Sequence, residues 1–199
     1  MTWTARRADP ADVQELTRIN AAAWRYAFGG RMSERLLART LPESRLNGWR
    51  RWVTLPDPDA VFVAEDDNGR IGAYCGVGGA GDPEDRHADM RTGELVALYV
   101  DPALLGTEAG AVAHGAGVEH LAMSGFRYAM LWALRDDTVS RAFYASHGWR
   151  QDGTVGCHDL NRQRLNTVRY GRFLPAPFRR HRRLPGTFGP AGSPHPSMM

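Results

Sequence analysis

The stretch from Gly93 to His120 constrains the fold of this chain more than any other part of the sequence. It reads GELVALYV, then DPALL, then GTEAGAVAHGAGVEH, which predicts a buried apolar strand, a glycine-punctuated loop and an alanine- and glycine-rich helix. Free backbone N–H groups converge where such a loop enters a helix, and the helix dipole adds partial positive charge there. The stretch therefore predicts a site that can hold a phosphate group.

The remaining elements follow from similar local signals. Asp9 and Pro10 begin a helix expected over residues 9–28, and Pro42 splits a second helical region expected over residues 33–52. Further strands are predicted at residues 60–65, 70–77, 128–134, 149–155 and 165–172, with a short helix at 139–146. Because a helix connects the strand at 93–100 to the strand at 128–134, these two strands should pair in parallel. We therefore expect one mixed sheet with helices on both faces, an α/β or α+β sandwich.

A glycine-rich segment, Gly76 to Gly81, matches the dinucleotide-binding pattern G-x-G-x-x-G letter for letter. That pattern requires a helix to begin within it, but here the residues Asp82-Pro83-Glu84-Asp85 follow and no helix starts. We therefore interpret the segment as a flexible loop and not as a dinucleotide site.

The composition is that of an ordinary one-domain globular protein, with 199 residues of which 43% are hydrophobic and 24% charged. The sequence contains no apolar run of about 18 residues, the length needed to cross a membrane, and its first residues lack the apolar core of a signal peptide. Both observations favour a cytoplasmic protein without membrane contact. Cys75 and Cys157 form no C-x-x-C pair, which predicts buried, unreactive thiols. His114 and His120 lack the i, i+4 spacing of a metalloprotease helix, and we expect no metal site.

The formal net charge of +3 is a property of the C-terminal segment. Residues 175–199 contain four arginines and no acidic residue, whereas the rest of the chain has 21 basic against 22 acidic residues. This distribution does not predict a nucleic-acid-binding face, and nucleic acid is not an expected partner. The same segment is rich in proline and glycine and should be disordered.

Three segments resemble the GNAT superfamily of acyl-CoA-dependent N-acetyltransferases. They are GELVALYVDPALLGTEAG at residues 93–110, LWAL at residues 131–134 with the acidic pair Asp136-Asp137 after it, and SRAFYASHGW at residues 140–149. The last is similar to the family signature A-x-x-F-Y-x-x-x-G-W/F. The resemblance implies a GNAT-like domain over residues 1–174, with a mixed, mostly antiparallel central sheet, followed by the basic tail at residues 175–199.

The resemblance also implies that acetyl-CoA is bound as a co-substrate. In the family, the pantetheine arm runs beside the central strand, and the matching backbone here belongs to Leu98, Tyr99 and Val100. The pyrophosphate contacts amides of the loop that enters the next helix. The residues that match this loop are Gly106, Thr107, Glu108, Ala109, Gly110 and Ala111. Asp137 matches an asparagine that often precedes the following helix.

Two residues match the family's catalytic positions. Tyr144 matches a tyrosine that protonates the departing thiolate, and a phenol with a pKa near 10 is protonated and able to donate. Glu94 matches a strand carboxylate that takes the proton from the amine in some members, and burial in an apolar strand should raise its pKa. The alternatives are that Tyr144 only packs against Phe143 with Trp132 or Trp149, and that Glu94 only caps or pairs with an arginine.

The pyrophosphate loop departs from the family pattern at three positions. Glu108 stands where glycine is commonest, Ala111 where an arginine is usual, and Val112 where a smaller residue is usual. Two readings of the chain therefore remain. The first is an N-acetyltransferase that acts by direct attack on an amine of a small molecule or a protein N-terminus, with a second copy of the chain (a homodimer) as a candidate partner. The alternative is a degenerate module that keeps the fold for binding or interaction.

Overall fold

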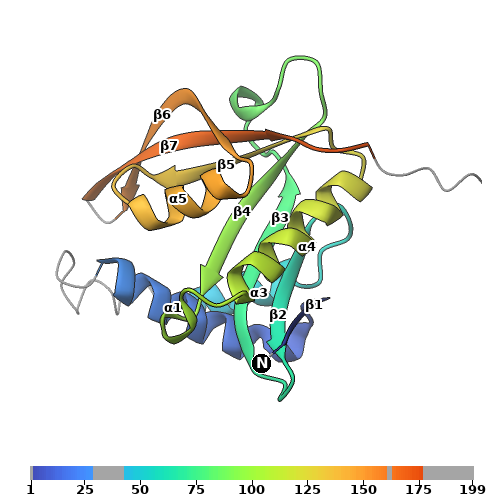
Figure 1. Cartoon of the computed structure of the whole chain (residues 1–199), viewed down its shortest axis with the longest axis vertical. Coiled ribbons are helices and arrows are strands. Elements are labelled where there is room, and N and C mark those ends of the chain that lie inside the picture. Colours follow the sequence, from blue (N-terminus) through green and yellow to red (C-terminus); the bar gives the residue numbers. More distant parts are fainter. Residues whose placement is uncertain (1, 29–42, 161–162, 177–199) are drawn as a thin grey trace, which may run out of the picture.

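The computed structural model describes residues 2–28, 43–160 and 163–176, which form a single sheet covered by helices (Figure 1). The strands are β1 (Trp3–Arg7), β2 (Ala60–Asp66), β3 (Ile71–Gly79), β4 (Thr92–Val100), β5 (Tyr128–Leu134), β6 (Arg150–Leu160) and β7 (Gln163–Phe173). The helices are α1 (Val13–Phe28), α3 (Glu43–Trp52), α4 (Ala109–Met123) and α5 (Thr138–Ser146). Short 3-10 turns occupy Pro10–Asp12, Pro83–Asp85 and Pro102–Leu104.

The sheet is mixed and mostly antiparallel, as the sequence predicts. Its strand order is β1-β2-β3-β4-β5-β7-β6, and within the described ranges β4 with β5 is the one parallel pair. That pair is joined through α4, which is the strand–helix–strand connection expected from the sequence. The strand order places β4 and β5 at the centre of the sheet.

Two apolar cores lie on opposite faces of this sheet. Helices α1 and α3 contribute residues such as Leu16 and Trp49 to one core, together with Val63 of β2. Helix α4 and helix α5 contribute residues such as Leu121 and Tyr144 to the other. Alternation along the strands explains the division, because successive side chains point to opposite faces. The expected helices on both faces are confirmed.

Two glycines on the inner surface of helix α4 let it lie close to the sheet. A β carbon added at Gly117 would stand 2.7 Å from Cys75 Sγ, and one at Gly110 would stand 2.9 Å from Val100 Cγ2. Separations under about 3 Å are not tolerated without movement of a neighbour. The glycines of the helix therefore set its distance from β3 and β4 and bring its first turn against the end of β4.

Most predicted elements are confirmed, and two local predictions are wrong. Strand β1 was not predicted; only the first of its five side chains is buried, so it shows no apolar alternation. The segment Gly76–Gly79 is strand and not loop, because β3 continues to Gly79. The absence of side chains there makes room for neighbours: the Trp52 ring lies over Gly76 and the Asp59 side chain over Gly78. The loop, predicted to begin at Gly76, begins only after Gly79 and occupies residues 80–91.

The predictions for the remaining segments are confirmed in part. Cys75 is fully buried and burial raises the pKa of its thiol, but Cys157 is exposed, so the prediction of two buried thiols is wrong for Cys157. It lies in β6 with its side chain away from both cores, which strand alternation allows. Residues 29–42 and 177–199, where half of a helical region and most of the tail were predicted, lie outside the described residues. No helix of the described chain is long and apolar enough to cross a membrane.

A buried histidine makes the stability of the fold depend on pH. Trp149 Nε1 donates a hydrogen bond of 2.9 Å to His114 Nε2, and both side chains are about 2% exposed. Burial, with the nearby His147 and Arg172, lowers the pKa of His114 from 6.5 to about 3. The ring is therefore neutral in the folded protein at pH values where an unfolded chain would protonate it.

We expect the free energy of unfolding to decrease as the pH falls from 6.5 towards 3. In this window the unfolded chain binds a proton that the folded chain excludes, so stability is lost by at most about 1.4 kcal/mol per pH unit. Urea unfolding at pH 7, 6 and 5 would measure the loss. His114→Gln keeps an acceptor for Trp149 but cannot titrate, and should flatten the dependence between pH 5 and 6.5. An equal slope in both proteins would contradict the assignment.

Candidate active site

Strands β4 and β5 part soon after they begin, and the candidate site is built around this divergence. They pair in parallel only at Thr92 with Tyr128, Gly93 with Ala129 and Glu94 with Met130. Beyond that point β5 pairs with β7 along its whole length, while β4 turns away (Figure 1). The β4 edge from Leu95 to Val100 therefore faces no strand on the β5 side within the described residues. We call this edge the β4–β5 split.

A β-bulge lies in β4 at the start of the split. Gly76 of β3 pairs with Ala97 and Val77 pairs with Leu95, so Val96 is an additional residue in β4. A bulge reverses the face to which the following side chains point. Leu95 accordingly packs on the α4 side and Ala97 on the α1 side. Val96 is 50% exposed, so the prediction that the whole strand is buried is wrong at this residue, whereas Ala97 is buried and residues 98–100 are partly buried.

The three strand residues predicted to hold the pantetheine arm lie beyond this bulge. Leu98, Tyr99 and Val100 are each partly buried, with Leu98 and Val100 packed on the α4 side and Tyr99 on the α1 side. The Tyr99 hydroxyl accepts a hydrogen bond of 3.1 Å from Trp24 Nε1. Their side chains thus point to the two faces of the sheet, and their backbone forms the unpaired edge of β4 at the split.

The predicted pyrophosphate loop lies between the end of β4 and the first turn of α4. Gly106 has a φ of +83°, a left-handed conformation that favours glycine. Thr107 Oγ1 donates a hydrogen bond of 2.7 Å to the Leu104 carbonyl, which holds the loop in place. The backbone N–H groups at the start of a helix have no intrahelical partners, and at α4 these belong to Glu108, Ala109, Gly110 and Ala111. The Ala109 N–H donates a hydrogen bond of 3.4 Å to Thr107 Oγ1. The loop therefore presents amides and the positive end of a helix dipole.

Glu108 is the N-cap residue of α4, but its side chain makes no capping hydrogen bond and is exposed. The carboxylate therefore does not occupy the helix amides. Its negative charge still lies at the end of the helix where an anion would be bound, so it should oppose anion binding through solvent.

Glu94 lies at the last paired position between β4 and β5. It is opposite Gly78 of β3, on the sheet face that α3 covers at Gly76. Burial is the main cause that raises the pKa of the Glu94 carboxyl; the charge of Asp85 adds to it, and a backbone hydrogen bond from Gly81 opposes it. The structure thus places a partly buried carboxyl with a raised pKa at the point where β4 and β5 diverge.

Tyr144 approaches from the other face, on α5. Asp137 caps this helix through hydrogen bonds of 3.0 Å from Ser140 N and 2.6 Å from Ser140 Oγ, so both carboxylate oxygens of Asp137 are engaged within the cap. Tyr144 is 7% exposed, and burial, with the charges of Cys75, Tyr99 and Asp137, raises the pKa of its hydroxyl.

The surroundings of Tyr144 leave its hydroxyl free to donate. Its ring packs edge-on against Trp149, with the centroids 6.4 Å apart, and lies 6.3 Å from Tyr170. Among the residues that the structure describes, none hydrogen-bonds the Tyr144 hydroxyl. The suggested packing against Trp132 does not occur, because Trp132 points to the opposite face, where it contacts Asp85.

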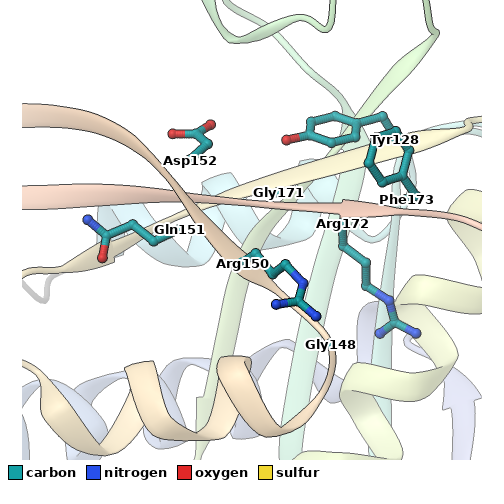
Figure 2. A pocket seen from close by; sticks show the side chains of 8 residues that line it. All are labelled: Tyr128, Gly148, Arg150, Gln151, Asp152, Gly171, Arg172 and Phe173. Atoms are coloured by element: carbon teal, nitrogen blue, oxygen red, sulfur yellow. The ribbon is translucent and has the colours of Figure 1, made fainter.

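Two surface hollows lie elsewhere and contain almost none of the predicted site residues. One, of about 320 Å³, is lined by Tyr128, Arg150, Asp152 and Arg172; Figure 2 shows both arginines on one side of β7 and Asp152 with Tyr128 on the other. The second, of about 690 Å³, lies between α4 and α5 and includes Ala111 at one end. No group of three metal-ligating side chains occurs in the described ranges.

The sequence did not single out three residues that the fold brings beside Glu94. Asp85 comes from the β3–β4 loop, Trp132 from β5 and Arg169 from β7, and they are joined by hydrogen bonds. Local sequence carries no signal for this group, since its members are 37 or more residues apart. Only the strand order places them together.

The fold is that of solved N-acetyltransferases. PaiA N-acetyltransferase of Thermoplasma acidophilum, solved with coenzyme A, superposes with a TM-score of 0.69 at 14% identity over 87% of this chain and 99% of that one. A GNAT phosphinothricin acetyltransferase of Sinorhizobium meliloti, solved with acetyl-CoA, gives 0.65 at 21% identity over 87% of this chain and 89% of that one.

Sequence comparison identifies the family. The model of the acetyltransferase (GNAT) family matches residues 15–149, and the chain belongs to this family. A curated relative, the mycothiol acetyltransferase of Nocardioides sp. (strain ATCC BAA-499 / JS614), is 31% identical over 160 residues, which cover 75% of this chain. The matched region is 50% of that relative, so the chain corresponds to about half of its length.

Proposed function

We propose that this chain is an acetyl-CoA-dependent N-acetyltransferase that acetylates an amine of a small molecule or of a protein N-terminus. The observation that carries the proposal is the β4–β5 split, an unpaired strand edge that leads directly to the N-terminus of α4. Glu94 and Tyr144 approach the split from opposite faces of the sheet, which suits a reaction that removes one proton and delivers another.

The residues present fit acetyl-CoA. The backbone of Leu98, Tyr99 and Val100 can pair with the amides of an extended pantetheine arm, as another strand would. Gly106 adopts a left-handed conformation with open space where a side chain would stand, which lets the backbone come close to a pyrophosphate. The first amides of α4, including that of Gly110, can hold it. Bound acetyl-CoA supplies the acetyl group as a thioester.

Two side chains would move the protons of the reaction. Glu94, directly or through a water, would accept a proton from the amine as the amine nitrogen bonds to the acetyl carbon. Tyr144 would donate its hydroxyl proton to the sulfur as the carbon–sulfur bond breaks. The products are an amide and a free thiol, and backbone amides at Leu98 to Val100 can hold the carbonyl oxygen.

The second candidate function is a degenerate module that keeps the fold for binding or interaction. The exposed carboxylate of Glu108 at the helix N-terminus, with Ala111 where the family has an arginine, favours it. Calorimetry and thermal shift with acetyl-CoA separate the two candidates. An enzyme should be stabilised by about 2.7 kcal/mol at 100 times its Kd, and no stabilisation at millimolar acetyl-CoA would exclude the first candidate.

Removing the charge of Glu108 should strengthen binding. Glu108→Gln takes a negative charge from the anion-binding end of α4, and we expect the Kd for acetyl-CoA to fall by about two- to fivefold at low salt. The gain should shrink as salt is added, because the side chain is exposed. Glu119→Gln, an exposed position later in the same helix, is the matched control. Equal affinities in all three proteins would show that Glu108 does not affect the cofactor.

The acceptor can be found by an amine screen with detection of the released thiol. The curated relative is a mycothiol acetyltransferase, so amines related to mycothiol belong in the screen beside amino acids, polyamines and peptide N-termini. The acceptor that gives the highest kcat/KM defines the substrate class.

A further inference from the structure

The β3–β4 loop, residues 80–91, is fixed to the sheet through the side chain of Asp85. Trp132 Nε1 donates a hydrogen bond of 3.0 Å to Asp85 Oδ2, and Arg169 Nη1 donates one of 2.9 Å to Asp85 Oδ1. The Arg169 guanidinium also lies over the Trp132 ring, 5.9 Å from its centre. Asp85 and Arg169 side chains are only 15% and 19% exposed, so the contact is largely shielded from water.

Further hydrogen bonds of Arg169, to β6 and to the backbone of the loop, support this contact. Arg169 Nε donates a hydrogen bond of 2.7 Å to Asp152 Oδ2, and its Nη1 reaches the Glu84 carbonyl at 3.1 Å. One arginine of β7 thus joins the β3–β4 loop to β6. A partly buried ion pair that is also satisfied by other hydrogen bonds holds its members in one geometry.

The strand register places Asp85 beside Glu94. Glu94 pairs with Met130, and Trp132, which bonds Asp85, is the next residue of β5 on the same face as Met130. The Gly81 backbone, in the same loop, is close enough to Glu94 to oppose the rise in the pKa of its carboxyl. The loop that Asp85 holds down is therefore one wall of the space that Glu94 faces.

Other charged groups lie on this face of the sheet or in the loop. Asp59, in the segment before β2, covers Gly78 opposite Glu94, and the exposed Arg86 of the loop donates a hydrogen bond of 3.3 Å to the Ala80 carbonyl. The cation on the β7 side, Arg169, is paired with Asp85 and with Asp152 of β6. Asp85 is the neighbour whose charge acts on the carboxyl of Glu94.

We propose that Asp85 is a positioning residue: held by Trp132 and Arg169, it fixes the β3–β4 loop and sets the place and charge surroundings of the Glu94 carboxyl. The inference rests on the role proposed above for Glu94 in taking the proton of the amine. Asp85 itself touches no reacting atom.

Two variants and one control test the proposal. Asp85→Asn removes the charge but keeps an oxygen for Trp132, and Trp132→Phe keeps the charge but removes the hydrogen bond. Glu84→Gln removes a charge from the neighbouring exposed side chain and serves as the control. The readouts are the pH dependence of kcat/KM, the affinity for acetyl-CoA, and a ¹³C NMR titration of the Glu94 carboxyl in the protein without substrate.

Asp85→Asn should lower the pKa of Glu94, because a nearby negative charge is lost, and move the acid limb of the pH profile to lower pH. Trp132→Phe should lower kcat about tenfold through misplacement of the loop, with an unchanged acetyl-CoA affinity. Glu84→Gln should resemble the wild type in every readout. If Asp85→Asn fails to fold, Trp132→Phe carries the kinetic test.

The failure of this inference can be told apart from failure of the proposed function. An Asp85→Asn protein whose Glu94 titration and kcat match those of Glu84→Gln would overturn the positioning role, even if Glu94 is the base. A Glu94→Gln protein with wild-type turnover would instead overturn the proposed role of Glu94. The NMR titration would then still report whether Asp85 acts on that carboxyl.

Discussion

Tyr144→Phe should lower kcat by about 100- to 1000-fold, within the contribution that a positioned general acid makes. The hydroxyl is buried and burial raises its pKa, so it holds its proton and can give it to a departing thiolate. Because the ring stays in place, the Kd for acetyl-CoA should change by no more than about twofold. Steady-state kinetics with detection of the free thiol, together with calorimetry, measures both quantities.

Tyr170→Phe is the matched control for this experiment. Tyr170 is also buried and its ring lies 6.3 Å from Tyr144, but its hydroxyl accepts a hydrogen bond of 3.1 Å from Arg141 Nε. Its loss should therefore cost about 1 kcal/mol of stability and leave kcat near the wild-type value. Equal turnover in the wild type and in Tyr144→Phe would show that the tyrosine has a packing role only.

Glu94→Gln should lower kcat/KM about 100-fold near neutral pH and remove the acid limb of its pH profile. Burial raises the pKa of Glu94, so the carboxyl takes up a proton at a higher pH than an exposed glutamate. Only the ionised form can accept the proton of the amine, so activity in the wild type should fall as the pH decreases through that pKa. Glutamine is isosteric and cannot accept this proton.

The measurement is kcat/KM from pH 5 to 9 for the wild type and for Glu94→Gln. The difference in kcat/KM between the two proteins should be smallest at high pH, where more of the substrate amine is already deprotonated. Affinity for acetyl-CoA should be unchanged, because Glu94 lies on the opposite face from α4. A variant that keeps both its rate and its acid limb would assign Glu94 a structural role.

The fold could be predicted largely from local sequence because its elements carry strong local signals. The strand at β5, predicted at residues 128–134, has these bounds in the structure, and the apolar run alone supplies them. Strand β1 was missed because it lies at the sheet edge with four of five side chains exposed. The glycine run of β3 predicts a loop because glycines are typical of loops. In the structure these glycines make room for Trp52 and Asp59, which come from elsewhere in the chain and leave no signal in the run itself.

Some residues of the candidate site could likewise be predicted from the sequence, and others could not. The sequence pointed to Glu94, Tyr144 and the loop from Gly106, through a family resemblance that the family match supports; the roles of these residues stay predictions. It gave no sign that Asp85, Trp132 and Arg169 lie together, because hydrogen bonds between residues this far apart leave no local pattern.

The sequence by itself determined the strand, the glycine loop and the helix between Gly93 and His120, because apolar runs, glycines and helix ends act over a few residues. Only the tertiary structure decided that β4 leaves β5 after Glu94 and that Val96 forms a bulge. Both depend on pairing between strands, where one additional residue reverses every later side chain. Strand β4, which the sequence predicts to be buried throughout, therefore has an unpaired edge in the folded protein, and the proposed activity rests on that edge.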